Sequence, residues 1–496
     1  MEESKNGFVK KYMLLLFALC FATIFGMLLC YNLMTGVKKY PLSVGIAAVC
    51  ALLLLLLKKR GPQIPEGACR FLTPVLLTVS AVRSFVLGFS LRTEYSSYTW
   101  DWVRIVTDCA RCVTEEGTFP ASYYAEYPNN RFICVLLTGF FRLVQKISPG
   151  ISYDGLITAS VFLSSLSVVL SVWILYAAVR VFAGEKEAFL FSVVSCLYTP
   201  LYLYATFAYT DTLSLPFISL GLLFFALFQK SAGEQQSGRE AVCIALCGMC
   251  FGLGGEVKTM AFIYLIAVVI TLLISEDRLP VKNLLILAAG AFLVIFLSGK
   301  MAGRMFPYSQ EEYDRYRFPA EQWIFMSLNP DGSGGYNGDD VHLAENTENY
   351  EARKALCREM LKGRVSQLGL KGTLEKMFYT KQLRTWTNPA LSGDDYIMRE
   401  PMGKGFLRKL YGKKKKLHKK FMIGMEALHL LLLFGTMLSV FPSGNQRKET
   451  LLLRISLVGI FLFLSIWECN SRYLYIFIPA LLITSSETLL FPRDAS

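Results

Sequence analysis

The residues best suited to chemistry lie in residues 98–130, a short aromatic stretch between two long apolar runs. From Asp101 onward the polar side chains recur at the spacing of one helical face, which predicts a helix with a polar stripe and an apolar face. The stripe consists of Asp101, Arg104, Asp108 and Arg111. Such a helix is typical of a membrane surface, where its aromatic side chains lie at the level of the lipid headgroups.

Asp101 is the candidate general base. It begins the polar stripe between Trp100 and Trp102, and indoles on both sides would partly desolvate the carboxylate and favour its taking a proton from a hydroxyl group. We expect Arg104 and Asp108 to bind the substrate. The alternative for these two residues is a surface helix tied by intrahelical ion pairs.

The second half of the stretch is rich in side chains that could border a sugar ring. They are Glu126, Tyr127, Asn129 and Asn130. Pro128 disfavours a helical conformation at the residue before it. The two asparagines could instead cap the next helix, and the tyrosine could belong to an interfacial aromatic belt.

Charged and aromatic residues near the mouths of three later apolar runs are candidates for binding the substrate. They are Tyr209 and Asp211, then Lys258, then Arg472 and Tyr473. Ionisable groups at such positions are default candidates for a functional site, and Lys or Arg can hold a phosphate. The alternatives are helix capping by the aspartate, an ion pair between the lysine and Glu256, and snorkelling to the interface.

The sequence gives little support to a metal, and no cofactor is expected. The chain has three histidines. Cys109 and Cys112 form a CxxC pair without the second pair that a zinc site needs. Asp339 and Asp340 lie among Gly and Asn residues and could hold a divalent ion, but no other ligand pattern accompanies them.

The hydropathy pattern predicts a membrane protein. The chain has 496 residues, of which 53% are hydrophobic, and its mean hydropathy is +0.41. Lipid-exposed backbone must form its own hydrogen bonds, so the long apolar runs must be helices. Because a crossing takes about 20 residues, we expect an all-α polytopic membrane protein with about 11 to 13 transmembrane helices.

The charge and the cysteines fit this class. The net charge of +13 indicates cytoplasmic loops and contact with anionic membrane lipids, and no soluble basic domain suggests a nucleic-acid partner. The thirteen cysteines lie mostly inside apolar runs, where cysteine behaves as a small hydrophobic residue. We expect no disulfide framework and a first apolar run that is retained as an anchor.

The apolar runs divide the chain into three parts. Residues 1–298 form a transmembrane module that includes an outer loop at 92–130, residues 299–420 form a mixed extracytoplasmic region, and residues 421–496 form the last helices. Within the second part, residues from about 349 to 369 are expected to form a helix. The positive-inside rule places Asp211 inside when applied from the N-terminus and outside when applied from the C-terminus. The conflict disappears if residues 131–147, which include Arg142 and Lys146, do not cross the membrane.

The end of the second part, residues 404–420, is strongly basic. On the outside this run goes against the positive-inside bias, although long loops are partly exempt. It could attract anionic donor lipids or be a solvated charge run. The alternative is that an unrecognised crossing places it in the cytoplasm.

These features together resemble the GT-C class of polytopic glycosyltransferases, and within it the bacterial relatives of the protein O-mannosyltransferases. The resemblance covers most of the chain and rests on the order of short motifs that are weak individually. The motifs are Asp101 in the first outer loop, YPNN at 127–130, YTD at 209–211, Lys258 after a Gly-rich break, residues 323–340 ending in GGYNGDD, and Arg472 and Tyr473 before Pro479.

The resemblance implies a polyprenyl-phosphate-linked sugar donor, a hexose or mannose, and a glycan, lipid or protein acceptor at the outer face of a bacterial plasma membrane. Asp101 would be the catalytic base of an inverting transfer, Lys258 and Arg472 would bind the donor phosphate, and the YPNN turn would border the sugar. The first loop has a single Asp where the best-known members have an acidic pair.

Two other function classes stay open. One is a transporter or flippase of a polyprenyl-linked or anionic substrate, which is expected to show inverted repeats and polar residues on broken helices. The other is a polymerase or ligase of cell-surface polysaccharide.

Overall fold

The computed structural model describes residues 2–60, 64–94, 100–115, 117–275, 280–441 and 447–489. Residues 98, 99 and 116 of the predicted outer stretch lie outside these ranges. Within them the regular structure is helical, with an isolated antiparallel bridge between Thr93 and Pro401. The fold is that of an all-α polytopic membrane protein, as predicted.

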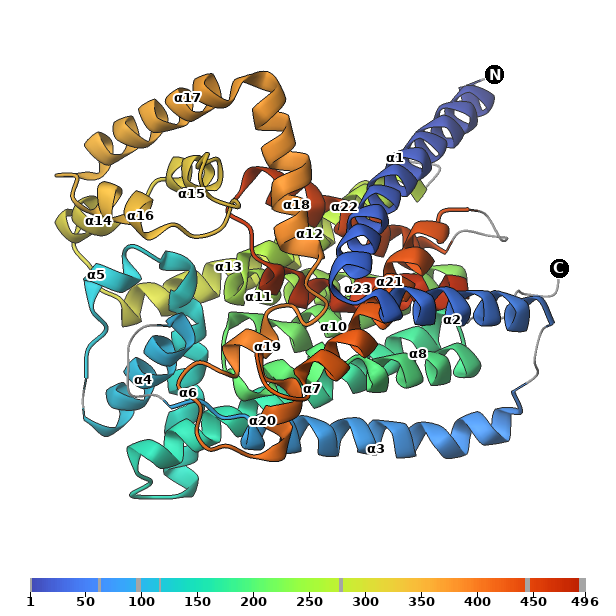
Figure 1. Cartoon of the computed structure of the whole chain (residues 1–496), viewed down its shortest axis with the longest axis horizontal. Helices are drawn as coiled ribbons and strands as arrows, with labels where there is room; N and C mark the ends of the chain where they lie inside the picture. The colour runs from blue at the N-terminus through green and yellow to red at the C-terminus, as the bar shows by residue number, and fades with distance from the viewer. Residues whose placement is uncertain are drawn as a thin grey trace.

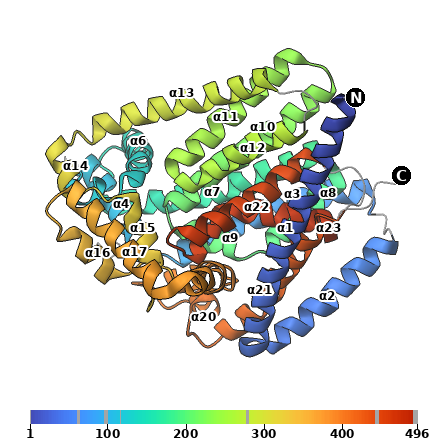
Figure 2. The same cartoon turned by 90° about the horizontal axis from the view of Figure 1, so that it is seen from above.

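Nine helices in the described part of the chain are long and apolar enough to cross a membrane, and many of them run along the long axis of the molecule (Figures 1 and 2). They are α1 (Glu2–Lys39), α2 (Pro41–Arg60), α3 (Glu66–Ser90), α7 (Tyr153–Phe182), α10 (Thr210–Gly233), α11 (Ser237–Val257), α13 (Val281–Met305), α21 (His418–Leu438) and α22 (Lys448–Ile466). A further pair, α8 (Glu185–Leu197) with the segment Pro200–Thr206, passes the same test across a bend of 59°. That segment consists of α9 (Pro200–Leu203) and η2 (Tyr204–Thr206).

The described part of the chain has fewer candidate crossings than the 11 to 13 that hydropathy predicts. The reason is that two apolar elements are shorter than the roughly 20 residues that a crossing takes. Helix α12 (Phe262–Ser275) has 14 residues and α23 (Ile478–Leu489) has 12. Both pack among the long helices, α12 against α22 and α23 against α21. Each follows a 3-10 turn, η3 (Thr259–Ala261) or η5 (Ser471–Phe477).

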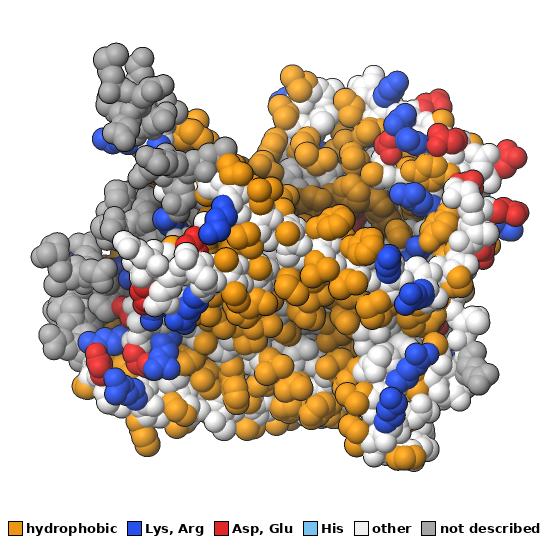
Figure 3. Space-filling view, turned by 180° about the vertical axis from the view of Figure 1, so that it is seen from behind, with side chains coloured by type: hydrophobic (Ala, Val, Ile, Leu, Met, Phe, Trp, Pro, Cys, Tyr) orange, Lys and Arg blue, Asp and Glu red, His pale blue; other side chains and the backbone are white. Residues whose placement is uncertain are grey.

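Figure 3 shows how the surface of this bundle is divided. A broad band of hydrophobic side chains crosses the middle of the molecule, and Lys, Arg, Asp and Glu gather toward its two ends. Helix α13 contributes exposed side chains to the apolar surface, among them Leu285, Phe292 and Leu297. An exposed apolar belt between two charged ends is the surface that a lipid bilayer covers.

The outer stretch folds into α4 (Asp101–Thr114), α5 (Ala121–Tyr124) and η1 (Pro128–Asn130), followed by α6 (Arg131–Ile147). The predicted helix from Asp101 is confirmed. Its apolar face is buried at Trp102, Ile105 and Cys109, while Arg111 on the polar stripe is exposed.

Helix α6 explains the conflict at Asp211. It has 17 residues and is not among the helices that are long and apolar enough to cross. It packs against α4 and α13, with Arg142 and Lys146 exposed. If α6 does not cross the membrane, the positive-inside rule places Asp211 at the same end as Asp101, whether it is applied from the N-terminus or from the C-terminus.

Residues 299–420 contain mostly short helices, and Figure 1 draws the first of them, α14 to α17, in yellow to orange near α5. They are α14 (Gln310–Tyr316), α15 (Ala320–Ser327), α16 (Gly338–Glu345), α17 (Tyr350–Glu375), the π-helical turn η4 (Lys376–Thr380), α18 (Lys381–Trp386), α19 (Gly393–Tyr396) and α20 (Phe406–Tyr411). The helix predicted for residues 349–369 is confirmed as the first part of α17. The side chain of Asn349 caps its start, and the helix bends at Gly369.

Backbone hydrogen bonds join this region to the segment before α4. The Glu94 amide donates to the Glu400 carbonyl at 2.7 Å, and the Met402 amide donates to the Arg92 carbonyl at 3.0 Å. The basic run that begins at Lys404 therefore lies at the same end of the molecule as α4.

Candidate active site

The carboxylate of Asp101 is held by hydroxyl groups from two distant segments. The Tyr123 hydroxyl donates to one oxygen at 2.7 Å, and the Tyr209 hydroxyl donates to the other at 3.2 Å. The side-chain amide of Asn130 donates to the Tyr123 hydroxyl at 3.0 Å. Asp101 is thus fixed at the first turn of α4 by groups from α5, from η1 and from the start of α10.

The two indoles beside Asp101 in sequence have other contacts. Trp102 packs against Phe207 and Tyr396, with ring centroids 5.0 and 5.3 Å apart. Trp100 stacks on Trp102 and receives the Arg399 guanidinium on its face, 3.3 Å from the ring centroid. Tyrosine hydroxyls, rather than indoles alone, therefore make the immediate surroundings of the carboxylate.

A second cluster of buried charges lies beside this network. The Asp211 carboxylate, 1% exposed, forms ion pairs with the Lys258 ammonium at 2.9 Å and with Nε of Arg472 at 3.5 Å. Asp211 does not cap its helix: Tyr209 occupies the N-cap position, and no side-chain cap is formed. The suggested pair between Lys258 and Glu256 is not formed either, because Glu256 accepts a hydrogen bond from Ser298 at 2.6 Å.

Irregular backbone brings these three charges together. Lys258 stands where α11 ends, with φ of −141° and ψ of 102°, and Arg472 lies in η5. Asp211 lies in the first turn of α10. Each residue therefore sits at a helix end, where backbone geometry changes over one or two residues and a polar side chain can turn toward its neighbours.

Tyr209 connects the charge cluster to Asp101. Its ring centroid is 5.1 Å from the Arg472 guanidinium and 5.8 Å from the Lys258 ammonium, while its hydroxyl binds Asp101. Tyr473 lies against the same two cations, at 5.5 and 4.9 Å, and its hydroxyl donates to Glu468.

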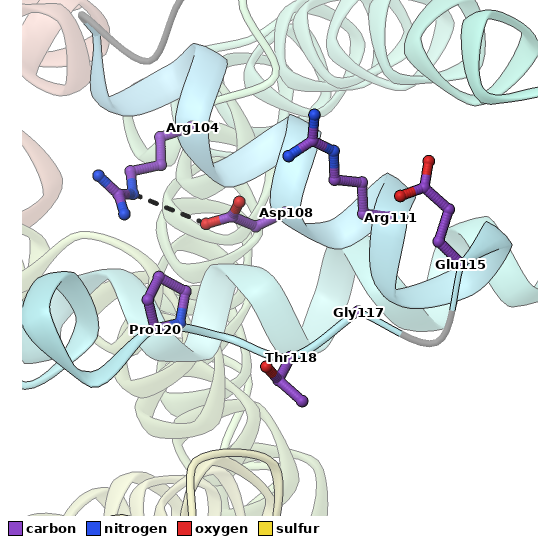
Figure 4. Close-up of a pocket in the computed structure, with 7 residues that line it drawn as sticks. All are labelled: Arg104, Asp108, Arg111, Glu115, Gly117, Thr118 and Pro120. Carbon is purple, nitrogen blue, oxygen red and sulfur yellow. Dashed lines mark ion pairs between the residues drawn. The ribbon is translucent and has the colours of Figure 1, made fainter.

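Arg104 and Asp108 lie farther along α4. The Nε of Arg104 is 3.7 Å from the Asp108 carboxylate, which also accepts a hydrogen bond from the Tyr124 hydroxyl at 3.0 Å. Burial raises the pKa of Asp108. The intrahelical ion pair that the sequence left as an alternative is therefore formed. The same two residues also line a pocket of about 320 Å³ (Figure 4).

The second half of the stretch forms an aromatic wall. Tyr127 packs against Tyr123 and Trp323, with ring centroids 5.0 and 5.9 Å apart. Burial raises the pKa of the neighbouring Glu126 to about 7. Asn130 precedes α6 but forms no side-chain cap, so the capping alternative is wrong for this residue. The side-chain amide of the exposed Asn129 donates to the Asn130 side chain at 3.1 Å.

The acidic pair at 339 and 340 does not join this site. The Asp340 carboxylate binds the Arg364 guanidinium through both oxygens, at 2.5 and 2.9 Å, and accepts from Asn329 at 3.0 Å. No group of three or more His, Cys, Asp or Glu side chains is arranged to hold a metal in the described ranges. Asp340 instead connects α16 to α17.

Sequence reasoning missed two members of the site. Tyr123 lies within the aromatic stretch 98–130, but its hydrogen bond to Asp101 depends on how α5 packs beside α4, which the sequence does not show. Glu468 lies four positions before Arg472 and shortly before the last apolar run. An ionisable residue at such a position is a candidate for a functional site.

Comparison with solved structures found matches of low identity. The oligosaccharyltransferase of Archaeoglobus fulgidus, in complex with zinc and sulfate, is 13% identical with a TM-score of 0.44 over 84% of this chain and 48% of its own. The same organism's oligosaccharyltransferase AglB, in complex with an inhibitory peptide and a dolichol-phosphate, is 14% identical with a TM-score of 0.42 over 84% and 50%. ArnT from Cupriavidus metallidurans in the apo state is 12% identical with a TM-score of 0.33 over 86% and 78%.

The chain spans about half the length of these oligosaccharyltransferases. No curated protein matches the sequence. A family model described as "conserved hypothetical integral membrane protein" matches residues 10–491, which is nearly the whole chain. The chain therefore belongs to this family of integral membrane proteins, and it is a multi-pass member.

Proposed function

We propose that this protein is a GT-C-type membrane glycosyltransferase. It transfers a sugar, a hexose or a mannose-like sugar, from a polyprenyl-phosphate donor to a hydroxyl group of a cell-envelope glycan, lipid or protein. The reaction takes place at the extracytoplasmic face of a bacterial plasma membrane. Asp101 is the base, Lys258 and Arg472 bind the donor phosphate, and the transfer is inverting and uses no cofactor.

The observation that carries the proposal is the double contact of Tyr209. Its hydroxyl donates to Asp101, and its ring lies beside the guanidinium of Arg472 and the ammonium of Lys258. A single side chain thus separates a carboxylate from two buried cations. A proton acceptor and an anion site with one tyrosine between them suit a transfer in which a hydroxyl attacks a carbon that carries a phosphate leaving group.

The three-charge cluster is suited to a phosphate. Among Lys258, Arg472 and Asp211 the cations are in excess by one charge, and the carboxyl of the nearby Glu468 accepts a hydrogen bond from Tyr473. Nε of Arg472 is buried and forms no hydrogen bond among the described residues, although an Asp211 oxygen lies 3.5 Å away. Buried polar groups are seldom left unsatisfied, so the cluster is expected to bind a polar group of a ligand.

The proposed reaction balances with these groups alone. The acceptor O–H gives its proton to Asp101 while its oxygen forms a bond to the anomeric carbon of the sugar. The bond between that carbon and the phosphate oxygen breaks, and its electron pair leaves with the polyprenyl phosphate. Lys258 and Arg472 stabilise the second negative charge that the phosphate gains.

Side chains around the base complete the proposed substrate site. Tyr127 and Asn129 border the transferred sugar, and the Tyr473 ring lies against the two cations. Glu126, half-buried beside the aromatic wall, contributes a hydrogen-bonding group at the edge of that wall. Membrane lipids surround the hydrophobic band and deliver the donor laterally.

The test is a transfer assay with the full-length protein in lipid nanodiscs, a polyprenyl-phosphate hexose and a cell-envelope extract as acceptor. Mass spectrometry measures released polyprenyl phosphate and the glycosylated product. We expect Asp101→Asn to lower turnover by about 10²- to 10⁴-fold, because the amide oxygen can still accept a hydrogen bond from one tyrosine hydroxyl but the amide cannot take the proton. Asp154→Asn, an exposed acid at the start of α7, is the matched control. Full activity of Asp101→Asn overturns the proposal.

A transporter of an anionic substrate is the second candidate, because Lys258 lies at the break between α11 and η3 and a bent pair precedes α10. Ions at the ends of broken helices are typical of transporters. The same nanodisc preparation distinguishes the two functions. Cleavage of the sugar–phosphate bond supports the transferase, and uptake of intact donor by proteoliposomes without cleavage supports the transporter.

A further inference from the structure

A pocket of about 320 Å³ opens on α4 beside the Asp101 network. Its lining consists of Arg104, Asp108, Arg111, Glu115, Gly117, Thr118 and Pro120. Figure 4 shows the side chains that successive turns of α4 contribute to the pocket, the segment 117–120 that passes beside them, and the Arg104–Asp108 ion pair at one side. The volume is near the lower limit of small-molecule sites, which are about 300–1,000 Å³.

The pocket is linked to the base by direct contacts. The Arg104 guanidinium lies over the ring of Tyr123, 4.6 Å from its centroid, and the Tyr123 hydroxyl donates to Asp101. Asp108 is seven residues after Asp101, which places it roughly 10 Å farther along the helix. That separation is comparable to the length of a disaccharide.

The chemistry of the lining points to a neutral, hydroxyl-rich ligand. Among the described lining residues two guanidinium groups and two carboxylates balance each other, so the net charge of these side chains selects neither an anion nor a cation. Hydroxyl groups can donate to the carboxylates of Asp108 and Glu115 and accept from the arginines. Pro120 is the apolar residue of the lining, which leaves little surface for the side chain of a peptide or for an acyl chain.

We propose that this pocket binds a sugar unit of a carbohydrate acceptor. The acceptor places the hydroxyl of its terminal sugar at Asp101 and the preceding sugar unit between α4 and residues 117–120. This inference rests on the proposed function and names the acceptor class, a glycan rather than a protein or a simple lipid alcohol. Arg111, exposed at the rim, binds the second sugar and lies away from the reacting atoms.

The test compares acceptors of one and two sugar units. With polyprenyl-phosphate hexose as donor, methyl glycosides of common bacterial sugars and the matching disaccharides are offered to the full-length protein in nanodiscs. We expect the disaccharide to have a KM about tenfold lower than the monosaccharide, and Arg111→Ala to abolish that difference while leaving the KM of the monosaccharide unchanged. Arg239→Ala, an exposed arginine at the opposite end of α11 from Lys258, is the matched control and is expected to keep the difference.

Several results overturn the inference. They are equal KM values for the two acceptors in the unmodified protein, an equal rise in both values with Arg111→Ala, or transfer to Ser/Thr peptides alone. If no donor is cleaved at all, the proposed function fails, and a measurement of disaccharide binding then tests the pocket by itself. Saturation-transfer NMR with the same disaccharides then supports the site if Arg111→Ala removes the signal, and refutes it if the unmodified protein gives none.

Discussion

At the level of single residues, the contribution of the Tyr209 hydroxyl can be separated from that of its ring. Tyr209→Phe removes the hydrogen bond to Asp101 and keeps the ring beside Arg472. A hydrogen bond to a charged group contributes about 1.5–3 kcal/mol. We therefore expect kcat for sugar transfer to fall about 10- to 100-fold with little change in the KM of the donor, measured by release of polyprenyl phosphate.

Tyr308→Phe is the control for this substitution, because Tyr308 donates its hydroxyl to the Phe119 carbonyl at 2.9 Å and lies outside the Asp101 network. It is expected to keep kcat. An unchanged kcat with a raised donor KM in Tyr209→Phe would assign the hydroxyl to donor binding and remove it from the positioning of the base.

Glu126 predicts a pH dependence of stability. Burial raises its pKa from the ordinary 4.5 to about 7 in the folded protein. Between these values the folded state binds more protons than the unfolded chain, so the stabilisation is complete below about pH 4.5 and is lost as the pH rises through about 7. Glu126→Gln keeps a neutral side chain at every pH, and we expect it to reduce the fall in Tm between pH 5 and pH 8.

Thermal unfolding in nanodiscs at the two pH values measures this effect. Glu348→Gln, an exposed residue of the same type, is the control and should leave the pH dependence as it is. A fall in Tm that is identical in Glu126→Gln and in the unmodified protein would show that other groups cause it.

At this scale the sequence could predict which residues carry charge near the membrane surface, but not their partners. Asp101, Asp211, Lys258 and Arg472 were all identified from their positions at the mouths of apolar runs. The pairing of Lys258 with Asp211 was not predictable, because the two residues come from different helices and Glu256 is nearer in sequence. Local spacing determines which face of a helix a residue occupies, whereas helix packing determines what that face meets.

At the level of elements, helical periodicity predicted α4 and the start of α17 correctly. The bend of α17 at Gly369 had only a weak signal, since a glycine within a helical pattern can be tolerated without a bend. Its φ of 64° and ψ of 178° belong to a region that is almost restricted to glycine. The bend turns the chain from α17 toward η4 and α18.

Gly369→Ala is therefore expected to destabilise this part of the protein by about 1–3 kcal/mol. No atom lies within 4 Å of the added methyl group, so the cost comes from the backbone and not from a clash. Hydrogen–deuterium exchange over residues 350–386 measures the loss as faster exchange on both sides of the bend.

Gly363→Ala is the matched control within the same helix. Its added methyl group also meets no atom within 4 Å, and its backbone is helical, so alanine is expected to stabilise the helix by about 0.5–1 kcal/mol. Equal effects of the two substitutions would contradict the role assigned to the Gly369 backbone.

At the level of the whole molecule, long-range contacts join α1 and α2 to α12 and α23 at the end opposite α4 (Figure 1). The Lys10 ammonium donates to the Ser275 carbonyl at 3.1 Å, and the Lys58 ammonium donates to the Thr488 carbonyl at 2.6 Å. Lys10, in the first part of α1, and Lys58, near the end of α2, therefore lie beside the last turns of α12 and α23. Clustered lysines of this kind mark the cytoplasmic side.

Hydropathy could predict the class and the approximate number of apolar segments, but not which of them cross. The short helices α12 and α23 match apolar runs in the sequence, yet their depth depends on the helices around them. The charge of the basic run after Lys404 is misleading about its side of the membrane, because its position also depends on the segments it contacts. Its charge alone favours the cytoplasm, whereas the hydrogen bonds of residues 400–402 to residues 92–94 place it at the Asp101 end.

This arrangement predicts the sidedness of three exposed sites. An epitope tag inserted after Gly150, in the α6–α7 turn, and one inserted after Lys404 should both be reached by antibody in intact spheroplasts, because both sites lie at the Asp101 end. A tag inserted after Glu234, in the α10–α11 turn, should be reached only after permeabilisation, because α10 runs away from Asp211. Sugar transfer in each tagged protein serves as the control for folding. If the tags after Gly150 and Lys404 are reached from opposite sides, the basic run and α4 cannot share one face, and a transfer site at the outer surface loses its structural basis.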